Sequence, residues 1–224
     1  MTETATPTEH PAPASVRPDV TAAQLADSLD ALGHRHQVLS GTIRPVATGL
    51  RAAGVARTLR FVPTEVDSAD PYRDFIDFMD TVEAGEVVVI ATGGCDRSAY
   101  WGELFSAAAL GRGAAGAVLD GPARDTAAIA ALGFPVFAAG ARPIDYRGRM
   151  RVDAAQVSVE CGGVTIAPGD LVVADGDGVV AAPGAVAHQA AAAADSRAAG
   201  ESTVLAELRA GARLGEVWER YGLL

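Results

Sequence analysis

The sequence predicts a single α/β domain that contains both parallel and antiparallel strands and ends in a helical arm. Three observations lead to this prediction. Buried β-branched runs alternate with helical segments in the middle of the chain, which is typical of parallel strands joined by right-handed crossovers. Short β runs separated by Gly and Asp turns follow, which favours antiparallel hairpins. A long alanine-rich segment then leads to the end of the sequence.

Residues 1–20 differ in composition from everything that follows. They are polar and rich in proline, so they bury too little apolar surface to offset the entropy of ordering. We therefore expect a disordered tail over 1–20 and one domain over 21–224, in which 185–224 form the C-terminal helical arm.

The individual elements follow from capping residues and apolar spacing. Thr21 is a good N-cap for a helix that carries Leu25, Leu29 and Leu32 on one face and stops at Gly33. The next elements are expected as a strand at 54–62, a helix at 72–83, a strand at 87–91, a helix at 103–112, a strand at 113–120, a helix at 126–133 and a strand at 134–140. Residues 156–183 are expected to form antiparallel strands, 185–210 a long helix, and the last residues a short helix.

Composition excludes several functional classes. The 28 acidic residues exceed the 18 basic ones, and no basic stripe is present, which argues against a nucleic-acid partner. No apolar run reaches the ~18 residues that a membrane helix needs. Two cysteines do not make a disulfide framework, and the first residues lack the apolar core of a signal peptide. We expect a soluble cytoplasmic protein with no membrane partner.

Two predicted loops, 92–103 and 121–125, follow parallel strands and precede helices, which is where open α/β sheets bind ligands. In the second loop, Arg124 is suited to clamp a substrate carboxylate, and Asp125 to hold Mg²⁺ or Mn²⁺. The alternative is that Asp125 only caps the following helix while Arg124 makes a surface ion pair. Both interpretations stay open at this point.

The first loop ends in Gly102-Glu103-Leu104 at the start of a predicted helix. Unpaired backbone N–H groups there are suited to bind a carboxylate, and Glu103 to hydrogen-bond a water on the metal. The alternative is a glutamate that is merely favoured by the helix dipole.

The segment GGCDRSAYWGELFSAAALGRGAAGAVLDGPARD (93–125) resembles the RraA-like family, which includes 4-hydroxy-4-methyl-2-oxoglutarate/4-carboxy-4-hydroxy-2-oxoadipate aldolases. GGVTIAPGDLVVADGDGVVAAP (162–183) and DSLDALG (27–33) are similar to further family segments. The matching positions in the first segment are Ala99, Trp101, Gly102, Glu103, Gly113, Gly116, Val118, Asp120, Gly121, Arg124 and Asp125.

The resemblance implies a swivelling β/β/α fold, assembled as homotrimers or hexamers with the active site between subunits. It implies that Arg124 binds the carboxylate and keto oxygen of pyruvate, and that backbone N–H groups near 102–104 hold the carboxylate. It further implies that Asp125 is the protein ligand of Mg²⁺ or Mn²⁺ and that Glu103 orients a water on the metal. Glu201 is the match for a family glutamate that reaches the site from a neighbouring subunit.

These implications predict a metal-dependent lyase that cleaves a 4-hydroxy-2-oxo acid to pyruvate through an enolate, and that also decarboxylates oxaloacetate. All 18 basic residues are arginines, which excludes a lysine Schiff base. Two alternatives remain: a protein-binding regulator of a ribonuclease, and a recruited lyase that acts on a specialised metabolite.

Overall fold

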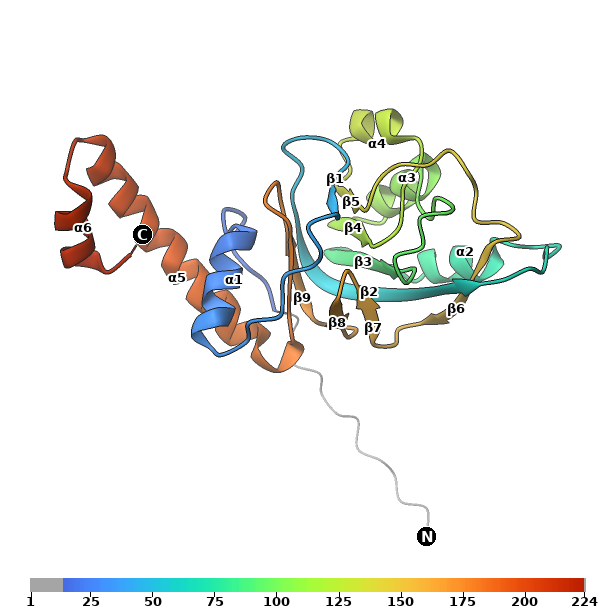
Figure 1. Ribbon diagram of the computed structural model, residues 1–224, viewed down its shortest axis with the longest axis horizontal. Helices are drawn as coiled ribbons and strands as arrows, with labels where there is room; N and C mark the ends of the chain where they lie inside the picture. Colours follow the sequence, from blue (N-terminus) through green and yellow to red (C-terminus); the bar gives the residue numbers. More distant parts are fainter. Residues whose placement is uncertain (1–13, 224) are drawn as a thin grey trace, which may run out of the picture.

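The computed structural model describes residues 14–223 and is built around one curled, mixed sheet (Figure 1). The strand order is β1-β5-β4-β3-β2-β9-β10, and β6 also pairs with β2. The strands are β1 (Arg44–Pro45), β2 (Ala52–Pro63), β3 (Glu86–Ala91), β4 (Gly116–Leu119), β5 (Val136–Ala138), β6 (Met150–Ala155), β7 (Val159–Cys161), β8 (Val164–Ile166), β9 (Leu171–Ala174) and β10 (Val179–Ala182). The helices are α1 (Ala22–Ala31), α2 (Arg73–Met79), α3 (Glu103–Gly111), α4 (Thr126–Leu132), α5 (Gly184–Arg209) and α6 (Leu214–Tyr221).

The predicted mixture of strand directions is confirmed. Strands β2, β3, β4 and β5 pair in parallel. Strands β9 and β10 form an antiparallel hairpin that joins the sheet through β2, and β7 and β8 form a separate antiparallel hairpin. The α/β class expected from the sequence is therefore the observed one.

Strand β3 is buried on both faces, as its continuous apolar run predicts. Val88 and Ile90 contact a core that holds α2, α3 and α4 against one face of the sheet. Val87 and Val89 contact a second core on the other face, beneath the β7–β8 hairpin. The carboxyl ends of β3 and β4 consequently emerge between two well-packed layers, which fixes the loops that follow them.

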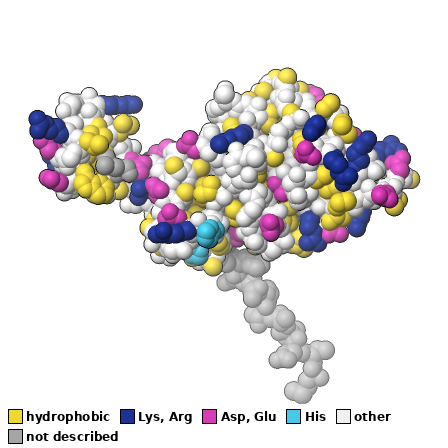
Figure 2. All heavy atoms as spheres, in the orientation of Figure 1, with side chains coloured by type: hydrophobic (Ala, Val, Ile, Leu, Met, Phe, Trp, Pro, Cys, Tyr) yellow, Lys and Arg dark blue, Asp and Glu magenta, His cyan; other side chains and the backbone are white. Residues whose placement is uncertain are grey.

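The helical arm has its own small core. Helix α1 begins with the predicted cap, since Thr21 and Gln24 form a reciprocal capping box. Leu25 and Leu29 are fully buried against the small alanines of α5, where close approach of the two helices is possible. Helices α5 and α6 extend away from the sheet (Figure 1), and apolar side chains gather at the tip of the arm (Figure 2).

Several boundaries differ from the prediction. Strand β6, which is not among the predicted elements, pairs with the far half of the long strand β2. Its alternation of Met150 and Val152 with Arg151 and Asp153 is half-buried, so it lacks the continuous apolar run of the other strands. The helix predicted over 72–83 ends at Met79, because the following residues turn toward β3.

The expected tail falls partly outside the described residues, since nothing is described for 1–13. Within it, Ala14 and Val20 are buried in the core of the arm, and the backbone N–H of Arg17 donates to Asp195 at 3.0 Å. Packed structure therefore begins before the predicted boundary, because the arm provides an apolar surface that local composition does not reveal. Within 14–223, no helix is long and apolar enough to cross a membrane.

Candidate active site

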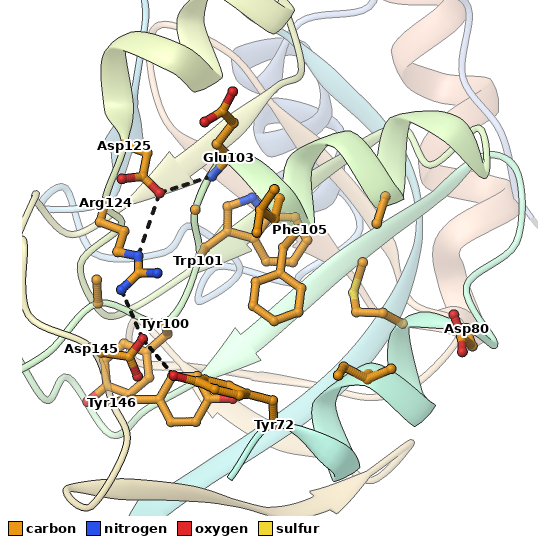
Figure 3. A pocket seen from close by; sticks show the side chains of 16 residues that line it. Tyr72, Asp80, Tyr100, Trp101, Glu103, Phe105, Arg124, Asp125, Asp145 and Tyr146 are labelled. Atoms are coloured by element: carbon orange, nitrogen blue, oxygen red, sulfur yellow. Dashed lines mark hydrogen bonds and ion pairs between the residues drawn. The ribbon is translucent and has the colours of Figure 1, made fainter. Parts of the chain in front are cut away.

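A cavity of about 670 Å³ lies where the loops after β3 and β4 meet helices α2 and α3 (Figure 3). Both loops singled out in the sequence contribute to it. Its lining residues are Tyr72, Ile76, Met79, Asp80, Ala99, Tyr100, Trp101, Gly102, Glu103, Leu104, Phe105, Ala108, Arg124, Asp125, Asp145 and Tyr146. The predicted location at the carboxyl ends of parallel strands is thus where a large cavity exists.

Backbone hydrogen bonds hold the two loops side by side. The N–H of Arg124 donates to the carbonyl of Trp101 at 2.8 Å, and the N–H of Tyr100 donates to the carbonyl of Pro122 at 3.0 Å. Asp120 secures the same region, since its carboxylate accepts from the backbone N–H and the hydroxyl of Thr92. Because these hydrogen bonds join main-chain atoms or buried groups, they fix the backbone of both loops and therefore the Cα positions of the cavity side chains.

The guanidinium of Arg124 lies between two carboxylates (Figure 3). Its Nη1 donates to Oδ2 of Asp145 at 2.9 Å, and its Nε lies 3.6 Å from Oδ2 of Asp125. Asp145 also accepts a hydrogen bond from the hydroxyl of Tyr72 at 3.1 Å. Arg124 is therefore held from two sides, through Nε and through Nη1, while its side chain remains 40% exposed.

Asp125 adopts the left-handed backbone conformation, with φ 55° and ψ 35°. Most non-glycine residues adopt this conformation at a cost of about 1–2 kcal/mol, and aspartate is among those that adopt it more readily. Asp125 occupies the N-cap position of α4, yet its side chain makes no cap hydrogen bond. Oδ2 instead accepts from the backbone N–H of Glu103 at 3.4 Å. The helix-cap interpretation of Asp125 is therefore wrong, because the left-handed backbone turns the carboxylate toward the other loop.

Gly102 makes this approach possible. A Cβ at this position would lie 2.8 Å from Oδ2 of Asp125 and 3.3 Å from Cγ of Arg124. The backbone of Gly102 is extended, so the requirement for glycine comes from space and not from conformation. The absence of a side chain at Gly102 thus leaves room for the carboxylate of Asp125 at the start of α3.

The donor chemistry fits a hard divalent cation. Mg²⁺ and Mn²⁺ take oxygen ligands, and Mg²⁺ usually keeps several waters with one or two protein carboxylates. The carboxylate of Asp125 is 45% exposed at the cavity, and Glu103 is exposed beside it. Within residues 14–223, no group of three or more His, Cys, Asp or Glu side chains is placed to hold a metal ion by itself. A metal here would rest on Asp125 and water, as the sequence predicts.

The tyrosines of the cavity stay protonated at neutral pH. Burial raises the pKa of Tyr72, and the nearby charge of Asp145 raises it further. Burial likewise raises the pKa of Tyr100 and of Tyr146. These side chains are consequently hydrogen-bond donors and apolar walls in this pH range, and not bases.

Sequence reasoning missed Asp145 and Tyr72. They lie in the segments after β5 and before α2, and neither belongs to a pattern that points to Arg124. Only the sheet order brings them to the loop after β4.

The structure does not bring Glu201 to the cavity of its own chain. Glu201 lies on α5, where it accepts from the side chain of Gln24 at 2.6 Å and pairs with Arg197 at 3.0 Å. Figure 1 shows this helix extending from the opposite side of the sheet to α2 and α3. Its predicted contribution to a neighbouring subunit's site stays a prediction.

A family model described as RraA-like, Aldolase/RraA, matches residues 22–181. The chain belongs to the RraA-like family. The match covers the sheet, both loops of the cavity and helix α1. The resemblance found in the sequence is therefore confirmed.

Two curated proteins with different names are similar to this chain. "Putative 4-hydroxy-4-methyl-2-oxoglutarate aldolase" of Halalkalibacterium halodurans is 34% identical over 140 residues, which are 62% of this chain and 61% of that protein. Protein DlpA of Legionella pneumophila is 31% identical over 118 residues, 53% of this chain but only 19% of that protein. The chain thus spans less than two thirds of the length of these relatives.

A solved structure confirms the fold. Streptomyces coelicolor RraAS2, described as an unusual member of the RNase ES inhibitor RraA protein family, superposes with a TM-score of 0.73 at 32% identity. The superposition covers 82% of this chain and 90% of that chain.

Proposed function

We propose that this RraA-like protein is a divalent-metal-dependent carbon–carbon lyase that cleaves a 4-hydroxy-2-oxo acid to pyruvate. One observation carries the proposal. The side chain of Asp125 does not cap its own helix; with the backbone in the left-handed conformation, its carboxylate lies beside Arg124 at a large cavity. Non-glycine residues in unfavourable conformations concentrate at functional sites. The similarity to a protein named as an aldolase supports the same activity.

Substrate binding is assigned to Arg124 and to the start of α3. The guanidinium is clamped at one edge by Asp145, which leaves it oriented for the carboxylate and keto oxygen of the pyruvyl group. The N-terminal N–H groups of α3, at Gly102, Glu103 and Leu104, are assigned as donors for the same carboxylate. Of these, the N–H of Glu103 donates to Oδ2 of Asp125 at 3.4 Å in the single chain, and it would exchange this partner for the substrate.

Asp125 is the residue that would hold Mg²⁺ or Mn²⁺. When bound, the cation supplies positive charge that stabilises the developing enolate oxygen. Arg124 stabilises the same charge as a fixed cation, because its orientation is set before substrate arrives.

Cleavage proceeds by loss of the proton from the C4 hydroxyl of the substrate and rupture of the C3–C4 bond. The electron pair of that bond forms the pyruvate enolate, which then takes a proton at C3. We assign proton transfer to Glu103, through water, and to Glu201 of a neighbouring subunit. Decarboxylation of oxaloacetate leaves the same enolate, so one site serves both reactions.

Assembly is part of the proposal. Glu201 lies on the arm, so it can act only in another copy's cavity, which requires an oligomer. The family resemblance leads us to propose a homotrimer or hexamer. The apolar side chains at the tip of the arm, Leu214 and Trp218 among them, are exposed in the single chain, which supports packing between subunits.

The test is pyruvate release from oxaloacetate and from 4-hydroxy-4-methyl-2-oxoglutarate, each with Mg²⁺, with Mn²⁺ and with EDTA. Arg124→Ala and Asp125→Ala are expected to abolish release. Arg151→Ala and Asp77→Ala, which change exposed charges outside the cavity, are the matched controls and are expected to retain it. Absence of metal-dependent enolate chemistry in the folded wild type would refute the lyase and favour the regulator alternative.

A further inference from the structure

The cavity has two chemically different ends. Arg124, Asp125 and Asp145 form the charged end. The other end, which we term the apolar wing, is built by α2 and α3 from Ile76, Met79, Leu104, Phe105 and Ala108. A ligand that fills the cavity therefore needs an anionic head and an apolar remainder.

The charges of the cavity disfavour a second anionic group. Arg124 is the only cation among the lining residues, all of which lie in the described part of the chain. The lining carboxylates are Asp80, Glu103, Asp125 and Asp145, and Asp80 lies well apart from Arg124 (Figure 3). Inside this cavity of the single chain, a second substrate carboxylate would meet either apolar side chains or further negative charge.

The apolar wing is preformed. The rings of Phe105 and Phe75 stack with centroids 4.0 Å apart, and the indole N–H of Trp101 donates to the hydroxyl of Ser106 at 2.7 Å. Leu104 is 81% exposed and Ile76 38% exposed in the single chain, so each has apolar surface free to cover a substrate group. Burial of apolar surface is the main favourable contribution such walls make to binding.

The cavity is also large for the small pyruvyl group. A volume of about 670 Å³ is in the range of sites that take drug-sized ligands, whereas Arg124 and Asp125 occupy only one end. The substituent at C4 of the substrate is the part that would extend from this end into the apolar wing.

We propose, on the basis of the lyase activity proposed above, that the preferred substrate is a 4-hydroxy-2-oxo acid with a single carboxylate and an apolar alkyl or aryl group at C4. Cleavage of the C3–C4 bond turns C4 into the carbonyl carbon of an apolar aldehyde or ketone. The hydroxyl proton leaves to the base, and the electron pair enters the pyruvate enolate, which is protonated at C3.

A neighbouring arginine provides the competing arrangement. Arg142 lines a smaller cavity of about 330 Å³ that shares Arg124 and Asp125 with the first one. A dicarboxylate substrate could place its second carboxylate there. Arg142 is already paired with Asp96 at 3.3 Å, and this cavity has about half the volume, so the apolar wing is the better-supported direction.

The experiment separates this inference from the proposed function. Exchange of the methyl hydrogens of pyruvate in D₂O, followed by NMR with Mn²⁺ or Mg²⁺, reports the enolate chemistry without any C4 group. The kcat/KM values for 4-hydroxy-2-oxo-4-phenylbutanoate and for 4-hydroxy-4-methyl-2-oxoglutarate then report the preference. We expect exchange, and at least a tenfold preference for the phenyl substrate, since even one methylene in an apolar pocket is worth roughly tenfold or more.

Variants locate the preference. Ile76→Arg puts a cation in the apolar wing and is expected to lower the ratio of phenyl to dicarboxylate kcat/KM at least tenfold. Leu110→Arg changes a residue of α3 that is 47% exposed and outside the cavity, so its ratio should match the wild type. A general loss of activity in a variant lowers both kcat/KM values and cancels in their ratio. Circular dichroism checks that each variant folds.

Exchange together with a dicarboxylate preference that disappears in Arg142→Ala would overturn the apolar assignment and leave the lyase standing. An unchanged ratio in Ile76→Arg would overturn it as well. Absence of both exchange and cleavage in the folded wild type would overturn the lyase and this inference together.

Discussion

Gly102→Ala tests the site by adding one methyl group and no charge. The new Cβ would lie 2.8 Å from Oδ2 of Asp125, whereas ordinary contact begins near 3.4 Å, so the carboxylate must withdraw by about 0.6 Å. Because the backbone of Gly102 is extended, alanine fits it without conformational strain. The substitution therefore moves Asp125 and leaves the fold in place.

A misplacement near 1 Å in an active site can cost about a hundredfold in rate. A shift of about 0.6 Å should accordingly lower kcat/KM for oxaloacetate by about ten- to a hundredfold. The obstructing atom is the end of a side chain, so the free energy of unfolding should change by less than about 1 kcal/mol, below the usual cost of overpacking. The corresponding fall in Tm is less than about 4 °C.

The assay is pyruvate release at saturating and at limiting Mn²⁺, with a thermal melt of the same sample. Gly111→Ala is the matched control, since Gly111 lies in α3 and a Cβ there meets nothing within 4 Å. It should retain activity. Full activity of Gly102→Ala at limiting Mn²⁺ would refute the role given to the Asp125 carboxylate.

Three further predictions concern other parts of the chain. Asp145→Asn removes the charge that clamps Arg124 and should lower kcat/KM for oxaloacetate by about three- to tenfold, through both a higher KM and a lower kcat, since Arg124 both binds the carboxylate and stabilises the enolate. Burial raises the pKa of Tyr146, so the folded state keeps a proton that the unfolded chain loses near pH 10. The free energy of unfolding should therefore fall as the pH rises above 10. In denaturant titrations, this fall should be less steep in Tyr146→Phe than in the wild type. Thr21→Ala removes the capping box of α1 and should destabilise the chain by about 1 kcal/mol in the same titrations.

Each of these predictions has a contradicting result. Asp77→Asn, on the exposed side of α2, is the control for Asp145, and equal kcat/KM values for the two variants would contradict the clamp. An unchanged alkaline slope in Tyr146→Phe would show that other groups carry the pH dependence. Thr203→Ala, at an exposed position in the C-terminal part of α5, should not destabilise the chain, and a loss of stability equal to that of Thr21→Ala would refute the cap.

The order and type of the main elements could be predicted because local physics is consistent along those segments. The apolar run 87–91 forms a strand buried on both faces, and Thr21 caps α1 as its side chain allows. Strand β6 could not be predicted, because its charged residues face solvent while its pairing depends on the distant half of β2.

The sequence by itself determined the family, the two loops of the cavity and the pair Arg124-Asp125, because strand ends and helix starts are set by neighbours along the chain. Only the tertiary structure decided that the Asp125 carboxylate turns away from its helix, and that Asp145 and Tyr72 complete the clamp. Only it showed the apolar wing opposite Arg124. The physical reason is that these features depend on side chains which are far apart in the sequence and which the order of the strands brings together. The spacing of residues along the chain does not reveal which of them meet.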